Sequence, residues 1–428
     1  MKFHRMLLSV LAVGLTGCVS FHSVPLDPST RAAALTDRRL DSRNWTLEAL
    51  IAEALANSPE LAVAKARHET ALAAVVTAGE RPNPTVAVAP QIVTPDLNWV
   101  NGTYGVVFDW TFETAGKRSR RVEAAREQAR ATASQVIDTH WKVRATLRRA
   151  YLDLWVAQRR ETLLNATATK QSEVVTALDQ RRKAGEASPL DLAQPRLLAA
   201  QLRLQASDAT KTVALARASL AAALSMGVSG VSGAEFSFAE FEKEPGKSSC
   251  HREQALLRRS DVLVALADYA TAEAILKLEI ARQYPDFHLN PGYEFDAGNN
   301  KWAIGFGLTL PVLNQNQGAI GEAEAKRKEL AAAFDAVQTR VLNECDRAAA
   351  GVEAARKKLS TLQALLKEQT SQMESMKQLA EAGEEDRLAL ISSEVEQASI
   401  SVANLDALAE LQAALGEMEA ATQTPRSP

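Results

Sequence analysis

The fold of this chain is decided by one short stretch, Trp302-Ala303-Ile304-Gly305-Phe306-Gly307-Leu308-Thr309-Leu310. Every second residue in it is large and apolar, and the residues between are small or weakly polar. This period of two is the pattern of a β-strand with one apolar face. The stretch also has the length, about ten residues, that a tilted membrane-spanning strand requires.

Two other segments alternate in the same way, and a third, Thr85 to Val93, does so more weakly with Val86 and Val88 in step. The predicted strands lie at about 85–93, 103–112, 286–295 and 301–310. Aromatic residues gather in these segments, although the whole chain is only 5% aromatic. That concentration weighs against the alternative of a half-buried sheet in a soluble domain. Four strands cannot close a barrel, and open sheet edges are not tolerated in lipid. Closure therefore needs other copies of the chain, and three protomers would supply twelve strands, an even number within the range of outer-membrane barrels.

The predicted strands fall in two copies of one unit. Pro84 and Pro90 recur as Pro285 and Pro291, both 201 positions on, and Ala184-Gly185-Glu186 recurs as Ala382-Gly383-Glu384, 198 positions on. Landmarks that keep their spacing in this way indicate a duplicated, pseudo-symmetric protomer. The predicted order is a signal peptide at 1–17, a tether at 18–44, repeat 1 at 45–227, an inter-repeat segment at 228–253, repeat 2 at 254–420 and a C-terminal tail at 421–428.

Long helices separate the strands. Residues 117–183 have no Gly or Pro in their interior, and a helix of that length would extend for roughly 100 Å. Its partner in the second copy is predicted at 320–382, and shorter helices follow at about 189–226 and 386–420. Helices this long must be buried against one another as coiled coils.

The start of the chain has the layout of a bacterial secretion signal, with Lys2 and Arg5 before a short apolar run. Leu15-Thr16-Gly17-Cys18 resembles a lipobox, which predicts that Cys18 becomes the first mature residue and carries acyl chains such as palmitate. The alternative is an ordinary signal peptide with an incidental cysteine. Val19 follows Cys18 in place of the Asp that favours inner-membrane retention, so we expect the outer membrane.

Charge and composition exclude several classes of function. Removing Lys2 and Arg5 from 49 basic residues leaves 47 against 52 acidic ones, a net charge of −5, which predicts no nucleic-acid partner. No catalytic constellation or cofactor-binding loop is present, so we expect neither an enzyme nor a cofactor. The six histidines lack metal-ligand spacing, and Cys250-His251 alone supplies too few ligands for a metal site. A disulfide between Cys250 and Cys345 is the less favoured alternative to free thiols.

With these features the chain resembles the outer-membrane factor family, the TolC-like exit ducts of tripartite efflux pumps and type I secretion. Glu113-Thr114-Ala115-Gly116-Lys117-Arg118-Ser119-Arg120-Arg121 is similar to a motif of the CzcC-like cation-efflux branch, and Leu310-Pro311-Val312-Leu313-Asn314-Gln315-Asn316-Gln317-Gly318 also resembles that branch. On physical grounds alone, the four cations at 117–121 would anchor to lipid headgroups or cap a helix start.

The resemblance implies a mainly α fold with a small β part, a homotrimer whose twelve-stranded barrel continues into an α-helical periplasmic tunnel. It implies an outer-membrane lipoprotein channel that exports heavy-metal cations, opened by a periplasmic adaptor (membrane fusion) protein and supplied by an inner-membrane RND-type pump. The alternatives are a duct for multidrug efflux or type I secretion, and a coiled-coil spacer lipoprotein. The spacer does not explain the aromatic strands.

The candidate functional residues lie at the two helix-to-helix turns. Gly185 can end one helix in the left-handed conformation, and Ser188-Pro189-Leu190-Asp191 has the capping chemistry of the next. In the second copy Gly383 ends the long helix, and Glu384-Glu385-Asp386 follow it.

The resemblance implies that the adaptor contacts the turns at Gly185 and Gly383 and that Asp191 belongs to an acidic periplasmic gate. The second-copy counterpart of Asp191 is Ala389, so Glu384, Glu385 and Asp386 would supply the charge there. In the alternative reading these carboxylates only stabilise helix starts. The two roles are compatible.

Overall fold

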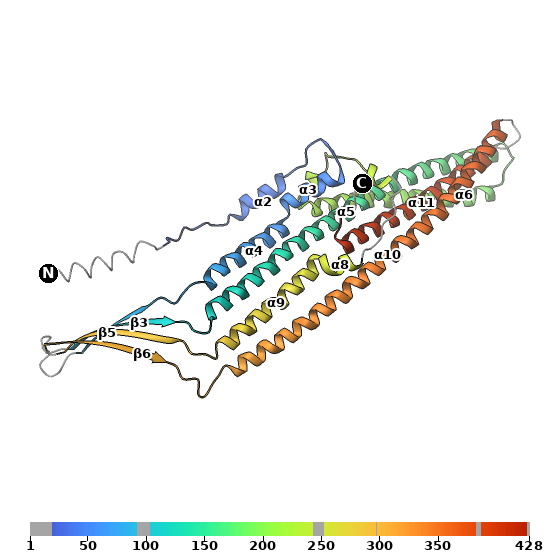
Figure 1. Cartoon of the computed structure of the whole chain (residues 1–428). Helices are drawn as coiled ribbons and strands as arrows, with labels where there is room; N and C mark the ends of the chain where they lie inside the picture. Colours follow the sequence, from blue (N-terminus) through green and yellow to red (C-terminus); the bar gives the residue numbers. More distant parts are fainter. Residues whose placement is uncertain (1–18, 92–102, 243–251, 297, 382–386, 426–428) are drawn as a thin grey trace.

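The computed structural model describes residues 19–91, 103–242, 252–296, 298–381 and 387–425. The protomer is elongated, with a small sheet at one end and paired helices at the other (Figure 1). Cys18 and the turn residues Gly383, Glu384, Glu385 and Asp386 lie outside the described residues.

The sheet has four antiparallel strands in the order β2-β3-β5-β6. Their bounds are β2 Thr85–Gln91, β3 Thr103–Phe112, β5 Phe287–Asp296 and β6 Asn299–Leu308. Because β3 pairs with β5, the two repeats contribute to one sheet. The last strand ends at Leu308, two residues before the predicted end, because its partner Phe287 is the first residue of β5.

The two faces of the sheet differ sharply, because side chains alternate along each strand. The register places apolar residues opposite one another, as in Phe112 with Phe287 and Tyr293 with Trp302. The exposed apolar side chains of this face are Val86, Val88, Phe108, Trp110, Phe112, Phe287, Trp302, Ile304, Phe306 and Leu308. The opposite face carries the polar side chains of β3 and β5.

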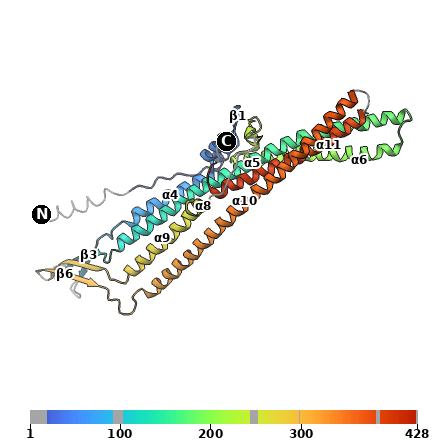
Figure 2. The same ribbon diagram turned by 45° about the vertical axis from the view of Figure 1, so that its right-hand side comes forward.

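Four helices continue from the strands and run side by side (Figures 1 and 2). They are α4 Pro59–Ala78, α5 Lys117–Lys183, α9 Ser260–Ala281 and α10 Gln317–Glu381. In the other half of the molecule, α6 Pro189–Ala223 packs on α5, and α11 Arg387–Thr422 packs between α5 and α10. Among the described residues no helix is both long and apolar enough to cross a membrane.

Two shorter helices, α11 and α9, are stacked end to end beside α5 and α10. The end of α11 meets the start of α9, where Arg259 Nη1 donates to Ala421 O at 3.0 Å and Ser260 N donates to Gln423 Oε1 at 2.7 Å. These contacts satisfy backbone groups that helix ends otherwise leave without partners. The stacked pair, of 36 and 22 residues, thereby runs beside the 65-residue α10.

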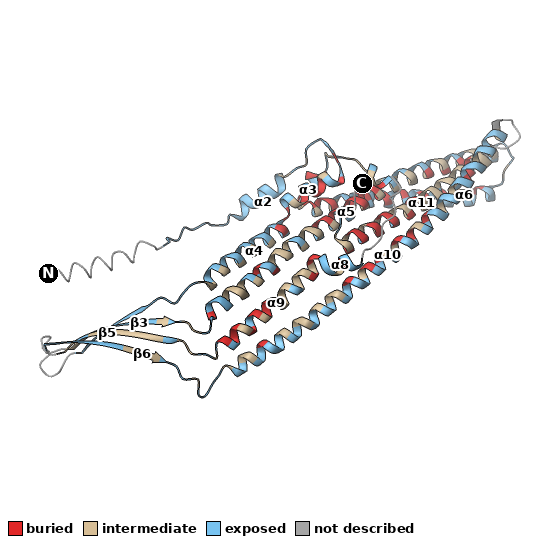
Figure 3. Cartoon of the chain, in the orientation of Figure 1, coloured by how far each residue is buried: buried red, intermediate tan, exposed pale blue. Residues whose placement is uncertain are grey.

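A belt of short elements lies at the middle of the molecule. It contains α2 Pro28–Asp37, β1 Asn44–Trp45, α3 Leu47–Asn57, a 3-10 turn at Val228–Gly230, β4 Glu235–Phe236, α7 Ala239–Glu242 and α8 Arg252–Arg258. Tyr151 of α5 is fully buried, and its hydroxyl donates to Trp45 O at 3.1 Å and Ser237 O at 2.8 Å. Figure 3 shows buried residues concentrated there, where α3 lies against α5.

One expectation about the cysteines is wrong. Cys345 is buried in α10 and is disulfide-bonded, whereas two free thiols were the favoured alternative. Its partner lies outside the described residues.

Candidate functional site

The turn between α5 and α6 is built on one left-handed glycine. Gly185 has φ +84° and nothing within 4 Å of a Cβ position, so backbone conformation rather than space requires glycine there. Glu186 N donates to Arg181 O at 2.9 Å, and Gly185 N donates to Arg182 O at 3.1 Å. This pair of hydrogen bonds is a Schellman motif, which closes the end of α5.

The predicted capping box at the start of α6 is present. Ser188 N donates to Asp191 Oδ2 at 2.7 Å, and Asp191 N donates to Ser188 Oγ at 3.3 Å. The Ser188 backbone N–H, followed by its hydroxyl, lowers the pKa of Asp191. Asp191 is exposed, so its charge faces solvent at the turn while its oxygen caps the helix.

Cations gather just before this turn around a single carboxylate. Asp179 of α5 lies 3.2 Å from Arg182, 3.0 Å from Lys183 and 3.3 Å from Arg196 of α6. Hydrogen bonds from Lys183 and Arg182 lower the pKa of Asp179. Arg196 therefore joins α6 to α5 close to the tip. In the second copy, Ala389, the counterpart of Asp191, lies within α11. The predicted turn residues 383–386 lie outside the described residues.

The motif at 113–121 binds helix ends at the junction of sheet and helices. Arg121 forms two contacts with the Glu113 carboxylate and donates to Ala78 O at 3.4 Å and Glu80 O at 3.2 Å. Arg118 donates to the neighbouring carbonyl of Gly79. These cations therefore cap the end of α4. The expectation that they cap a helix start is wrong for Arg118 and Arg121, whereas their contact with lipid headgroups stays a prediction.

Lys117 in the same motif connects the two repeats. Its side chain is buried and donates to Asp286 Oδ1 at 2.8 Å, just before β5. Thr114 N donates to the same oxygen at 2.9 Å. Burial opposes ionisation of Asp286, but these two donors outweigh it and lower its pKa. Within repeat 2 the contact equivalent to those of Arg118 and Arg121 uses an amide, since Asn316 Nδ2 donates to Glu279 O near the end of α9 at 2.8 Å.

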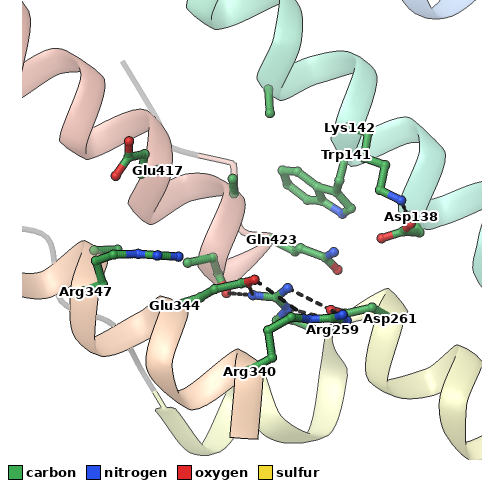
Figure 4. A pocket seen from close by; sticks show the side chains of 14 residues that line it. Asp138, Trp141, Lys142, Arg259, Asp261, Arg340, Glu344, Arg347, Glu417 and Gln423 are labelled. Atoms are coloured by element: carbon green, nitrogen blue, oxygen red, sulfur yellow. Dashed lines mark hydrogen bonds and ion pairs between the residues drawn. The ribbon is translucent and has the colours of Figure 1, made fainter. Parts of the chain in front are cut away.

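A pocket of about 690 Å³ lies where α11 meets α9 (Figure 4). Figure 4 shows the Arg259 guanidinium between Asp261 and Glu344, with Trp141 on the facing wall. Arg259 contacts each carboxylate at 2.8 Å. Burial opposes ionisation of Asp261, but Arg259 outweighs it and lowers the pKa of Asp261. The charges are matched within the wall, so this pocket serves the joint between helices.

Sequence reasoning missed a buried ion network between α5 and α11. Arg144 contacts Glu419 at 2.5 Å and Glu48 at 2.8 Å, and Arg148 Nη1 donates to Gln412 O at 2.9 Å. Burial opposes the charge on Arg144, but the two carboxylates outweigh it and raise the pKa of Arg144. The sequence signal for this network was the spacing of Arg144 and Arg148, four residues apart on one helix. In the part of the chain that the structure describes, no three His, Cys, Asp or Glu side chains converge as a metal site.

Known proteins match this chain both in sequence and in structure. The family model for outer membrane efflux proteins matches residues 50–225 and 252–423. The cobalt-zinc-cadmium resistance protein CzcC of Cupriavidus metallidurans is 27% identical over 296 residues, which cover 66% of this chain and 68% of that relative.

Solved structures show the same fold. The open state of the MtrE outer membrane channel of Neisseria gonorrhoeae has a TM-score of 0.72 at 18% identity, covering 88% of each chain. The outer membrane protein VceC of Vibrio cholerae has a TM-score of 0.70 at 21% identity, covering 88% of this chain and 95% of that one. At these identities the likeness shows the fold alone.

Proposed function

Because this chain belongs to the outer membrane efflux protein family, we propose that it exports heavy-metal cations as the outer-membrane channel of a tripartite pump. Members of the family are passive channels of the outer membrane and periplasm, not enzymes. The observation that carries the choice of cargo is the 27% identity to a cobalt-zinc-cadmium resistance protein. The chain would be a conduit, with selection of the ion made by its inner-membrane RND-type partner.

The sheet supports a homotrimer. Within the described protomer, β2 and β6 each have one edge without a neighbouring strand. On the apolar face Trp302, Ile304 and Phe306 are 80%, 71% and 75% exposed. Three copies of this four-stranded sheet would close into twelve strands. The apolar face would then contact outer-membrane lipid, and the polar face would line the lumen.

The far end of the helices would hold the gate and the adaptor contact. Asp191 carries an exposed charge at the turn, and three copies would form an acidic ring that attracts cations. Glu384, Glu385 and Asp386 would add charge at the second turn. A periplasmic adaptor would bind the turns at Gly185 and Gly383, and acyl chains on Cys18 would anchor the chain after signal-peptide removal.

The test is the cation sensitivity of a deletion strain across zinc, cadmium, cobalt, nickel, copper and silver, beside a panel of dyes and antibiotics. Sensitivity confined to metals and restored by the intact gene is the expected result. Sensitivity to dyes and antibiotics alone would replace the cargo with drugs, and loss of a secreted polypeptide without either sensitivity would indicate type I secretion.

Complementation with Gly185→Ile should fail although trimers form, because a β-branched residue is strained at φ +84°.

A further inference from the structure

The polar face of the sheet carries a histidine, His288, that has no role in the proposed efflux function. His288 of β5 lies opposite Thr111 of β3 and Gly307 of β6. Among the histidines that the structure describes, His288 is the one that lies within a strand. Its side chain is 35% exposed and that of Asp109 is 38% exposed, so a solute that reaches this face can reach the imidazole.

Asp109 fixes the orientation of the His288 ring. His288 Nδ1 lies 3.0 Å from Asp109 Oδ1 and 3.3 Å from Thr111 Oγ1. An ionised carboxylate only accepts hydrogen bonds, so the contact with Asp109 requires a proton on Nδ1. In the neutral ring Nε2 is then the nitrogen with a free lone pair. A carboxylate behind a histidine in this way is the arrangement that orients metal-binding imidazoles.

Glycines keep the neighbouring strand clear beside the ring. A Cβ atom at Gly307 would lie 3.3 Å from His288 Cβ and 3.6 Å from Asn290 Oδ1. The next position of β6 on the same polar face is Gly305, where a Cβ atom would lie 3.3 Å from Asn290 Cβ. A side chain at either glycine would therefore crowd His288 or Asn290, and with glycine β6 places no side chain against them on the polar face.

We propose that His288 Nε2, oriented by Asp109, is a weak binding site for divalent transition-metal cations passing through the channel. The proposal rests on the proposed function, because that function places the polar face in the lumen. Imidazole nitrogen suits zinc, copper, nickel and related ions, whereas magnesium prefers oxygen ligands. A single imidazole falls short of a full coordination shell. Conduction requires such weakness, since an ion must leave each site that it enters.

The experiment is carbethoxylation of the purified full-length trimer by diethyl pyrocarbonate, followed by peptide mass spectrometry. Zinc chloride should slow modification of His288 several-fold in a concentration-dependent way, and magnesium chloride should not. His22 is the internal reference, because it is exposed and contacts the Ser20 hydroxyl rather than a carboxylate. Equal rates at His288 with and without zinc would overturn the proposal.

Two matched variants separate orientation from general charge. Asp109→Asn should weaken the apparent zinc affinity at His288 about 10-fold, as loss of an orienting carboxylate does in metal sites. Asp296→Asn removes the same charge from the same face, but Asp296 contacts Lys301 at 2.6 Å rather than His288. This variant should keep wild-type zinc protection. An equal loss in both variants would contradict the role of Asp109.

The outcomes distinguish this site from the efflux function. Metal resistance restored by the intact gene, together with unprotected His288, would refute the site and leave the function standing. Protection of His288 by zinc in a chain that restores only drug resistance would keep the site and refute metal cations as the cargo.

Discussion

Gly416 of α11 lies directly against the guanidinium of Arg148 of α5, where a Cβ atom would be 2.4 Å from Arg148 Nη1. That nitrogen donates to Gln412 O, one turn earlier in α11. Arg148 is buried, and it also lies 3.4 Å from Glu419. The glycine therefore allows a buried cation to lie flat on the neighbouring helix and join the two repeats.

Gly416→Ala should destabilise the protein by about 1–3 kcal/mol, the usual cost of overpacking a filled interior. The displaced guanidinium would lose its buried partners. The matched control is Gly351→Ala in α10, where the nearest atom to a Cβ would be Ala414 Cβ at 3.9 Å. That change should stabilise the protein by about 0.5–1 kcal/mol through helix propensity. Thermal unfolding followed by helical circular dichroism measures both, and equal midpoints would refute the steric explanation.

Arg121→Lys should loosen the junction of sheet and helices. A lysine cannot reproduce the fork that contacts Glu113, Ala78 O and Glu80 O together. We expect a loss of about 2 kcal/mol, the scale of hydrogen bonds to charged groups. Arg120→Lys is the control in the same motif, because Arg120 is exposed and forms an i,i+3 pair with Glu123 on its own helix. It should change stability by less than about 0.5 kcal/mol. Similar effects of both substitutions on trimer melting would contradict the capping role.

Asp261 should make the helix joint sensitive to acid. Its folded pKa is lowered, so the stabilisation is present above its unfolded pKa of about 3.9 and is lost as pH falls through the lower folded value. Asp261→Asn should reduce stability at neutral pH. It should also flatten the acid limb, which is the loss of stability as pH falls. Asp153→Asn, which removes a half-exposed partner of Arg149, should leave the limb unchanged. Unfolding midpoints measured from neutral pH to acid decide this, and an unchanged limb in Asp261→Asn would exclude the pair as its cause.

Glu240 should have the opposite pH dependence. Burial, the largest effect, raises its pKa above the ordinary value of 4.5. The folded chain then holds that proton more tightly than the unfolded chain. The stabilisation is present below the unfolded pKa and is lost as pH rises through the folded pKa. Glu240→Gln should therefore stabilise the belt at neutral pH, while the exposed neighbour in Glu242→Gln should have no such effect. Destabilisation by Glu240→Gln in the same melting assay would show that its charge has a compensating partner.

Two substitutions at the first turn separate capping from gating. Ser188→Ala removes the hydroxyl that accepts from Asp191 N and should cost the start of α6 about 1 kcal/mol, seen as faster hydrogen exchange. It leaves the Asp191 charge in place, so cation selectivity in planar bilayers should persist. Asp191→Asn keeps a capping oxygen but removes the charge, and selectivity should fall. Unchanged selectivity in Asp191→Asn would leave that residue with the capping role alone.

Local chemistry made much of the architecture predictable. The alternation around Trp302, the uninterrupted helix at 117–183 and the turn from Gly185 to Asp191 all depend on residues near one another in sequence. The structure has a strand at Asn299–Leu308 and a helix at Lys117–Lys183. The resemblance to the outer-membrane factor family is also confirmed. The cation motif was predicted less well, because a charged residue beside a helix start gives no indication that it will cap a different helix.

The strands, the long helices and the capped turn follow from local sequence, because period and turn chemistry act over a few residues. Which of these elements meet depends on the folded arrangement. Asp109 and His288 are 179 positions apart, and Arg148 and Gln412 are 264 positions apart. Such contacts depend on the pairing of β3 with β5 and the packing of α11 on α5. The physical reason is that a short-range pattern specifies which face of an element is apolar, whereas a partner across the fold is selected by the shape and charge of both surfaces together.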